Sequence, residues 1–319
     1  MKPLVIYHAD CTDGYGAAFA AWMKLGGGAE YRPTNYNEGW AWAIYNEDGT
    51  AFDNRDVYIL DFSFSRQGMD YIFANAKRVV WLDHHKTAFE MWEPNSLGCL
   101  PLKEGEHYET YGQHKIILHP NKSGALLAWE YFHPGTEVPM LIQHIDDRDR
   151  WQFKLEGSKE LHAALSSYKP WSFEQWRSFI NTRSLSGLPY EEGRAILRAQ
   201  DQHVKSMAKQ ARKCEITVHV EGKKARKALK AFAVNPDPTF PGLAVNASLH
   251  QSEVGHELAN QSGTYGLVWY LGSDNKVRCS LRSNGDYDVS AIAKSFGGGG
   301  HRNAAGFETD VNTLVGWLK

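Results

Sequence analysis

The sequence lacks any apolar run long enough to cross a bilayer, and its first residues lack the apolar core of a secretory signal. Cysteine is scarce as well, with four residues among 319 and no C-x-x-C pair. This scarcity excludes a disulfide framework and a zinc ribbon. We therefore expect a cytoplasmic protein with reduced thiols and no association with a membrane.

An excess of charge of one sign is also absent. The formal net charge is −2, in a chain that is 42% hydrophobic and 23% charged. This balance gives no support to binding of nucleic acid through a general positive field, although a local site for a short anionic substrate remains open. What the chain does have is length, since 319 residues exceed what one hydrophobic core usually serves. We therefore expect two domains.

The first 150 residues alternate short apolar runs with helix-like segments. The alternation predicts an α/β domain with a parallel, wound sheet. Residues 88–118 are irregular and rich in proline and glycine, which indicates an insertion or a long loop. Strand-like runs are found at 4–7, 57–60 and 79–82, and helical patterns at 17–22, 65–76, 121–133, 139–147 and from 172 onward.

The second half of the chain has a different texture. Residues 190–213 form a polar helical pattern, which is typical of a connector between domains. Strand patterns then follow at 216–220, 231–234, 266–270 and 277–281, before a short helix at 290–296. We expect a first domain at residues 1–188, a helical linker at 189–213 and a smaller α/β domain at 214–319. A basic cluster at 223–227 is read as a solvated loop or as a weak attraction for nucleic acid.

Acidic and histidine residues follow three of the strand-like runs. The run at 4–7 ends at His8, the run at 57–60 ends at Asp61, and the run at 79–82 ends at Asp83-His84-His85. Because the carboxyl ends of parallel strands gather functional groups, these side chains are expected to converge. Carboxylates and imidazoles together suit a divalent transition metal. For the triplet alone, a polar loop with chance histidines is an equal alternative.

These motifs, in this order, resemble those of a known superfamily. His8 with Asp13-Gly14, Asp61, Asp83-His84-His85 and an aspartate near 149 resemble the four motifs of the DHH phosphoesterases. The glycine-rich stretch 297–306, together with 280–283, resembles the signature of their C-terminal DHH-associated domain. The resemblance runs from residue 4 to about residue 307.

The resemblance implies a centre of two metal ions, with manganese as the first choice and magnesium as the second. Two such ions lie about 3.5–4 Å apart and act together on one phosphate. Asp61 would bridge the ions, His85 would contact the bridging water or the phosphate, and Asp83 would orient a ligand histidine. The implied metal ligands are His8, Asp10, Asp13, Asp61, His84 and Asp149.

Two positions of this ligand set stay open. The family pattern has an acid two positions before the Asp of Asp-Gly, where this chain has Cys11, and Asp10 lies three positions before. Asp10 is preferred as the ligand, a thiolate from Cys11 would favour a softer metal, and Asp10 could instead only cap a turn. Near the fourth motif, Asp149 is preferred over Asp146 and Asp147, which could pair with Arg148 and Arg150.

The glycine-rich stretch is expected to bind the substrate. Backbone amides there would cradle a phosphate, and a neighbouring guanidinium would fork onto it. A flexible linker is the alternative for four consecutive glycines. The implied substrate-binding residues are Gly298, Gly299, Gly300, His301, Arg282 and Asn303.

The predicted function is that of a manganese-dependent phosphodiesterase acting on short RNA or DNA oligonucleotides or on nucleotides. Hydrolysis by a metal-activated water is expected, in an exonucleolytic mode, and a homodimer is an open alternative to a monomer. Two further functions stay open. One is a catalytically weak nucleotide-binding or sensing protein of the same fold, and the other is a phosphatase acting on 3′-phosphoadenosine 5′-phosphate.

Overall fold

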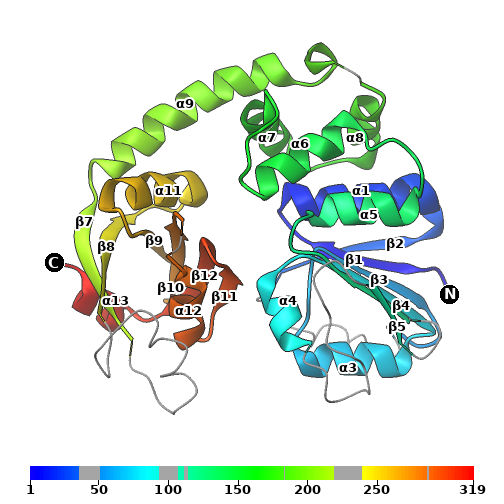
Figure 1. The fold of residues 1–319 in the computed structure, drawn as a ribbon, viewed down its shortest axis with the longest axis horizontal. Helices are drawn as coiled ribbons and strands as arrows, with labels where there is room; N and C mark the ends of the chain where they lie inside the picture. Colours follow the sequence, from blue (N-terminus) through cyan, green and yellow to red (C-terminus); the bar gives the residue numbers. More distant parts are fainter. Residues whose placement is uncertain (36–50, 93–106, 111–113, 183, 219–238, 286) are drawn as a thin grey trace. The chain divides into compact units, whose positions relative to one another are not determined.

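The computed structural model describes residues 1–35, 51–92, 107–110, 114–182, 184–218, 239–285 and 287–319 (Figure 1). It divides into two compact units, Met1–Leu197 and Arg198–Lys319. The helix α9 (Tyr190–Ala208) runs through the division. The domain bounds at 188 and 213 stay a prediction. No helix in the described part of the chain has the length and apolar character that a membrane span needs.

The first unit is built on a wound α/β sheet, as predicted. Its strands lie in the order β2-β1-β3-β4-β6-β5, and every neighbouring pair is parallel except β5 and β6. The central strands are buried on both faces, which explains their continuous apolar runs. The strands are β1 (Leu4–His8), β2 (Glu30–Thr34), β3 (Asp56–Leu60), β4 (Arg78–Asp83), β5 (His107–Thr110) and β6 (His114–Leu118).

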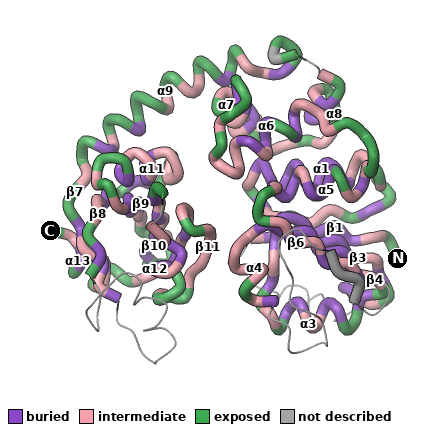
Figure 2. The backbone as a smooth tube through the Cα atoms, viewed as in Figure 1, coloured by how far each residue is buried: buried purple, intermediate pink, exposed green. Residues whose placement is uncertain are grey.

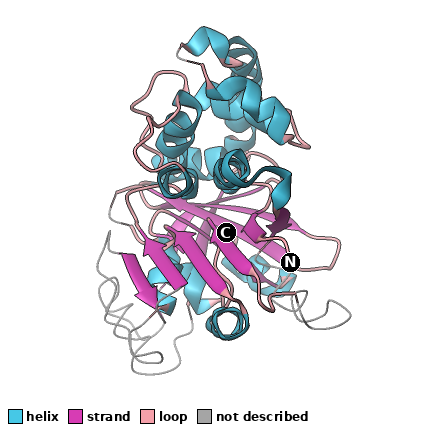
Figure 3. Ribbon diagram, turned by 90° about the vertical axis from the view of Figure 1, so that its right-hand side faces the viewer, coloured by secondary structure: helices cyan, strands magenta, loops and turns pink. Residues whose placement is uncertain are grey.

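Helices cover both faces of this sheet (Figures 1 and 3). One core lies under α1 and α5, and a second core lies on the opposite face under α3. Figure 2 shows the buried parts of the chain concentrated between these layers. The helices are α1 (Thr12–Leu25), α3 (Arg66–Asn75), α4 (Lys86–Met91), α5 (Gly124–Phe132), α6 (Met140–Asp149), α7 (Ser158–Ser167) and α8 (Phe173–Ile180).

Most of the predicted helices of this unit are confirmed, and serine side chains cap the start of several of them. Ser65 accepts a hydrogen bond from the backbone N–H of Gly68, and Ser172 accepts one from Gln175. The helix expected at 121–133 begins later, at Gly124, because the side chain of Ser123 caps it.

The long loop predicted at 88–118 is wrong where the structure describes it. The helix α4 continues to Met91, and the segment His114–Leu118 is β6, which pairs in parallel with β4. The strand is only five residues long and follows several glycines and prolines, so its apolar alternation was hidden. Residues 93–106 and 111–113 lie outside the described part.

The second unit is a mixed sheet with helices. Its strands lie in the order β11-β12-β10-β9-β8-β7, with β8 and β9 parallel and the other pairs antiparallel. This confirms a smaller α/β domain. Its elements are β7 (Arg212–Thr217), β8 (Thr239–Asn246), α11 (Gln251–Ser262), β9 (Tyr265–Leu271), β10 (Val277–Ser283), α12 (Val289–Ser295), β11 (Gly299–His301), β12 (Ala304–Thr309) and α13 (Val311–Trp317).

Two predictions for this part of the chain are wrong in their bounds, and others concern residues outside the described part. The helix expected to end at residue 213 ends at Ala208, because β7 begins at Arg212 and pairs with β8. The strand expected at 216–220 begins earlier for the same reason. The strand at 231–234, the basic cluster at 223–227 and residues 219–220 lie outside the described residues.

Candidate metal centre

The acids and histidines predicted to converge do so at one edge of the first sheet. The strands β1, β3 and β4 are direct neighbours and run in parallel, so His8, Asp61 and the Asp83-His84-His85 triplet leave the sheet on the same side. Asp61 follows β3 with a left-handed φ of 52°, a conformation that aspartate tolerates better than most residues. Its backbone N–H donates to the carbonyl of Leu82 over 2.9 Å. This bond fixes Asp61 beside the end of β4.

The two carboxylate oxygens of Asp61 serve two different imidazoles. Oδ1 lies 3.0 Å from Nε2 of His84, and Oδ2 lies 3.6 Å from Nδ1 of His8. Asp61 is only 1% exposed. Burial acts to raise its pKa, but the hydrogen bonds to His8 and His84 outweigh burial and hold the pKa below the usual range. Asp61 is therefore an ionised carboxylate between two imidazole nitrogens, the placement that a ligand bridging two metal ions would need.

Asp13 enters the cluster from the first turn of α1. Its two oxygens accept the backbone N–H groups of Gly124 and Ala125, at 2.7 and 2.8 Å, and Oδ2 lies 3.4 Å from Nε2 of His84. These amides are the first of α5, where the helix dipole favours a negative charge. The start of α5 thus holds Asp13 in place.

Two glycines let these helices approach the strand ends. A Cβ on Gly124 would lie 2.4 Å from the Cβ of Asp61, and a Cβ on Gly14 would lie 2.2 Å from the carbonyl oxygen of His8. Neither distance is compatible with a side chain. Gly124 was not singled out in the sequence, where its only signal was its position directly after a capping serine.

Asp149, at the end of α6, completes a second group of donors. Its Oδ2 lies 3.6 Å from Nε2 of His84, and one donor atom from each of Asp13, His84 and Asp149 lies within 4.8 Å of the others. Burial raises the pKa of Asp13, and the nearby charges of Asp61 and Asp149 raise it further. Burial and the charge of Asp61 also raise the pKa of Asp149.

The close approach of these acids bears on whether the residues fit a metal ion. Three carboxylates and two imidazoles face one another in a largely buried space, and the mutual repulsion of the acids is a cost that a divalent cation would remove. Oxygen and imidazole donors together suit such a cation. The buried cluster is consistent with a metal site.

The other two acids near Asp149 have partners within the fold. Asp147 accepts hydrogen bonds from the backbone N–H groups of Lys154 and Leu155, at 2.8 and 3.1 Å, and from the hydroxyl of Ser158 at 2.6 Å. Asp146 accepts the N–H of Ser123 and pairs with Arg150. The structure thus brings Asp149 to His84 and uses Asp146 and Asp147 elsewhere.

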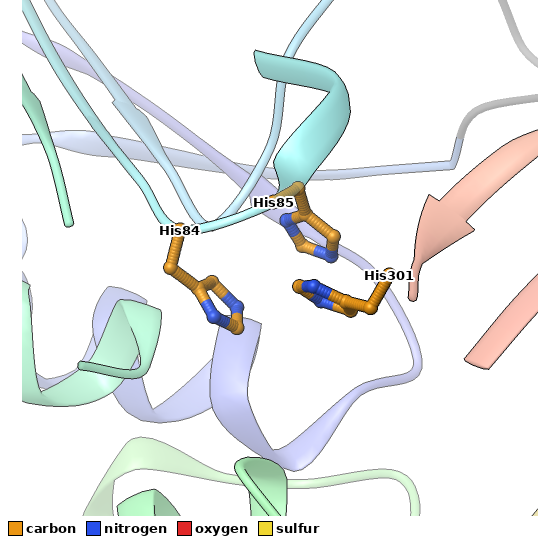
Figure 4. Close-up of side chains that lie close together, drawn as sticks. All are labelled: His84, His85 and His301. Atoms are coloured by element: carbon orange, nitrogen blue, oxygen red, sulfur yellow. The ribbon is translucent and has the colours of Figure 1, made fainter. Parts of the chain in front are cut away.

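Asp83 lies behind the two histidines and is fully buried. Its Oδ1 accepts the backbone N–H groups of His84 and His85 and contacts Nδ1 of His85 at 2.7 Å, while Oδ2 accepts the hydroxyl of Ser63. Burial acts to raise the pKa of Asp83, but His85 outweighs it and the pKa is lowered. Figure 4 shows the two imidazoles, whose ring centroids lie 4.6 Å apart after the end of β4. Asp83 therefore orients the ring of His85, whereas Asp61 contacts the ring of His84.

The structure does not bring Asp10 into the cluster. Its side chain is 78% exposed, with Nζ of Lys169 3.5 Å from Oδ1 and 2.7 Å from the backbone carbonyl. Instead, Sγ of Cys11 lies within 4.8 Å of donor atoms of His8 and Asp61. Burial lowers the pKa of His8, but its hydrogen bonds to Asp61 and Cys11 outweigh burial and raise the pKa to about 11. The sequence motif alone did not show that Cys11 lies near His8 and Asp61, or that Lys169 lies beside Asp10.

In the second unit, the glycine-rich stretch is part of the sheet and its neighbouring turn, not a linker. The N–H of Gly298 donates to the carbonyl of Ala293 over 2.9 Å, and a Cβ at this position would lie 2.1 Å from the carbonyl oxygen of Gly306. Gly299 and Gly300 belong to β11, and Gly300 has a φ of 137°. The amide of Gly298 is therefore already used at the end of α12.

The three side chains predicted to bind substrate in this unit differ in their surroundings. Asn303 donates through Nδ2 to the hydroxyl of Ser283 at 2.9 Å and to the carbonyl of Gly285 at 3.2 Å. Arg282 donates to the hydroxyls of Ser252 and Ser280, at 2.7 and 3.0 Å. His301 ends β11 and is half-buried. Asn303 thus closes a turn of its own unit.

Comparisons with known proteins agree with these motifs. The DHHA1 domain family matches residues 243–314. The chain is 29% identical over 320 residues to the uncharacterized protein R106 of Acanthamoeba polyphaga mimivirus, covering 95% of this chain and 66% of that protein. It is 22% identical over 311 residues to the oligoribonuclease NrnB of Bacillus subtilis, covering 94% and 71%. The chain thus spans about two thirds of the length of these relatives.

Two solved structures also match over nearly the whole chain. One is an uncharacterized protein from Helicobacter pylori, with 15% identity, a TM-score of 0.44 and coverage of 98% of this chain and 94% of that chain. The other is the pGpG-specific phosphodiesterase PggH from Vibrio cholerae, with 14% identity, a TM-score of 0.46 and coverage of 99% and 95%.

Proposed function

Because the chain belongs to the DHH/DHHA1 phosphoesterase family, we propose that it is a metal-dependent phosphodiesterase that cleaves short oligonucleotides or nucleotide phosphodiesters from an end. The observation that carries this proposal is the position of Asp61. Its two oxygens face His8 and His84, and Asp13 and Asp149 complete the second side. Such a bridging carboxylate among imidazoles and further acids is what a two-metal hydrolytic centre requires.

The proposed ligands fall into two sets that share Asp61. His8 belongs to one set, and Asp13, His84 and Asp149 belong to the other. Manganese is the proposed ion for both positions, with magnesium as the second choice. Two divalent ions at such a centre supply a hydroxide at neutral pH and neutralise charge on the phosphate oxygens.

Asp83 and His85 act together beside these ligands. The contact of Asp83 with Nδ1 of His85 fixes the proton on that nitrogen, so that Nε2 is the atom that exchanges a proton or meets a phosphate oxygen. The bond from Ser63 and the two backbone N–H groups keep Asp83 in its buried position. Asp83 is therefore proposed as a positioning residue for His85.

The second unit is proposed to bind the substrate through Arg282, His301 and the amides of Gly299 and Gly300. A guanidinium recognises phosphate with two parallel hydrogen bonds. The relative NrnB is an oligoribonuclease, which supports a short RNA as the substrate to be tried first. Gly298 and Asn303 are left out of this proposed set, because the amide of Gly298 closes the end of α12 and Nδ2 of Asn303 closes a turn of its own unit. The guanidinium of Arg282 also has partners, the hydroxyls of Ser252 and Ser280, which a phosphate would have to join or replace.

A substrate panel with manganese tests the proposal. A 5′-phosphorylated RNA dinucleotide, a short DNA, a cyclic dinucleotide and 3′-phosphoadenosine 5′-phosphate are compared for product release. We expect the wild-type protein to release mononucleotides from the RNA dinucleotide. We expect Asp61→Asn to release them at least about a hundredfold more slowly, because loss of a bridging metal ligand should lower activity more than loss of a group that only supports a ligand. The matched control is Asp70→Asn, which changes an aspartate on α3 that is paired with Arg66.

The outcomes separate the alternatives. Faster release of phosphate from 3′-phosphoadenosine 5′-phosphate than of mononucleotides from RNA would replace the phosphodiesterase by a phosphatase. Nucleotide binding without turnover of any substrate on the panel would favour a sensing protein.

A further inference from the structure

We propose that Cys11 is a thiolate ligand in the half-site that it forms with His8 and Asp61, and that this half-site takes a thiophilic divalent ion such as Zn²⁺ in preference to Mn²⁺. The two halves of the centre would then hold different kinds of ion. This inference rests on the metal centre of the proposed function, and it changes the identity of one of its two ions.

Three donors of different chemistry meet at this half-site. Sγ of Cys11, a ring nitrogen of His8 and a carboxylate oxygen of Asp61 all lie within 4.8 Å of one another. The residues come from three separate positions: the end of β1, the residue before α1 and the residue after β3. His8 and Cys11 are close in the chain, and the pairing of β3 with β1 brings Asp61 to them.

The thiol of Cys11 forms a hydrogen bond with His8 and does not cap the helix that follows it. Cys11 is the N-cap residue of α1, yet its side chain makes no capping hydrogen bond. It is half-buried, whereas Cys214 and Cys279 are packed in the core of the second unit. Burial raises the pKa of those two thiols to about 11 and about 12, the behaviour of inert core cysteines.

The nearby acid that could have taken this place points elsewhere. Asp10 has a left-handed φ of 56°, and its 78% exposed side chain lies beside Lys169. Lys169 also binds the backbone carbonyl of Asp10, which holds the loop in this conformation. The position that faces His8 and Asp61 is thus filled by sulfur, not by a carboxylate.

This donor set has a defined preference among metals. Thiolate, imidazole and carboxylate are the three ligand types of zinc, and catalytic zinc sites use three protein ligands with one position left for water. Thiolates disfavour Mn²⁺ and Mg²⁺, which prefer oxygen donors. The group of Asp13, His84 and Asp149 offers two carboxylates and one imidazole and suits those harder ions.

Cobalt absorption gives a direct readout of the bond. The metal-free full-length protein is titrated with Co²⁺ without oxygen, and the near-ultraviolet spectrum is recorded together with bound cobalt from equilibrium dialysis. We expect a thiolate-to-cobalt charge-transfer band that saturates at one ion per chain. The band is expected to vanish in Cys11→Ser and to persist in the matched control Cys279→Ala.

Competition between metals measures the selectivity. We expect the Zn²⁺-over-Mn²⁺ affinity ratio of this half-site to fall at least about tenfold in Cys11→Asp, which keeps a negative ligand but removes the sulfur. Circular dichroism shows whether each variant is folded.

Cobalt bound without a charge-transfer band, or a band that survives in folded Cys11→Ser, overturns the proposal. An unchanged zinc-to-manganese ratio in Cys11→Asp overturns the selectivity. Neither readout uses turnover. A band in a protein that cleaves no substrate therefore sinks the proposed function alone, and activity without a band sinks only the role of Cys11.

Discussion

The metal cluster of the first unit and the glycine-rich stretch of the second unit use their polar groups in different ways. In the cluster, Asp13, Asp61 and Asp149 face one another and two imidazoles, and burial together with the nearby acidic charges raises the pKa of Asp13 and Asp149. In the glycine-rich stretch, the amide of Gly298 and the side chain of Asn303 bind groups of their own unit. Buried ionisable groups that repel one another are typical of a functional site, whereas polar groups that hydrogen-bond within turns stabilise the fold.

The same contrast occurs within the single helix α6. Asp147 and Asp149 are two residues apart, but only Asp149 lies near His84. Asp147 accepts three hydrogen bonds from the segment that follows the helix. The two acids therefore provide an internal test, because they share chemistry and helix but differ in what they contact.

The largest effect is expected when these two acids are changed separately to asparagine. Asp149→Asn should slow turnover by at least about a hundredfold with little change in thermal stability, because it removes a proposed metal ligand. Asp147→Asn should lower the free energy of unfolding by about 2–3 kcal/mol, because hydrogen bonds to a charged group are lost. Initial rates and denaturant unfolding of both variants measure this.

The reverse pattern would break the comparison. If Asp147→Asn abolished turnover at temperatures where it stays folded, while Asp149→Asn turned over normally, the ligand at the end of α6 would be Asp147.

A smaller effect is expected at Gly300. Its φ of 137° and a Cβ position 2.5 Å from the carbonyl oxygen of Ala304 leave no room for a side chain. Gly300→Ala should therefore destabilise the protein by about 1–3 kcal/mol. Gly316→Ala is the control, since this exposed glycine of α13 meets nothing within 4 Å and should be neutral or stabilising. Thermal melts of the two variants decide whether the stretch is held by packing, and equal melting temperatures would contradict it.

The smallest effect is expected at Asn303. Asn303→Ala removes the hydrogen bonds to Ser283 and Gly285 and should cost about 1 kcal/mol of stability. The KM for an RNA dinucleotide should stay unchanged, because the side chain is engaged within its own unit. A raised KM in a variant with normal stability would instead return Asn303 to the substrate site, as the family resemblance predicted.

The sequence was sufficient to predict the wound sheet and most members of the cluster. Short apolar runs ended by His8, Asp61 and the Asp83-His84-His85 triplet are a local signal, and parallel strands bring such ends together. The sequence did not predict β6, whose five residues follow the irregular segment with several glycines and prolines in the first unit. It also misplaced the end of α9, where pairing of β7 with β8 overrides a helical pattern. In both cases the pairing with another strand defines the element, and the local pattern does not show that pairing.

The sequence by itself determined which residue types stand at the strand ends, because burial on both faces demands apolar runs and leaves polar residues only where they stop. The tertiary structure decided which of them meet. It placed Cys11 and not Asp10 beside His8, and Asp149 and not Asp147 beside His84. The reason is geometric, since neighbouring residues in a turn or at a helix end point in different directions. The packing of α1 and α5 beside the sheet, and of α6 on α1 and α5, selects one of them.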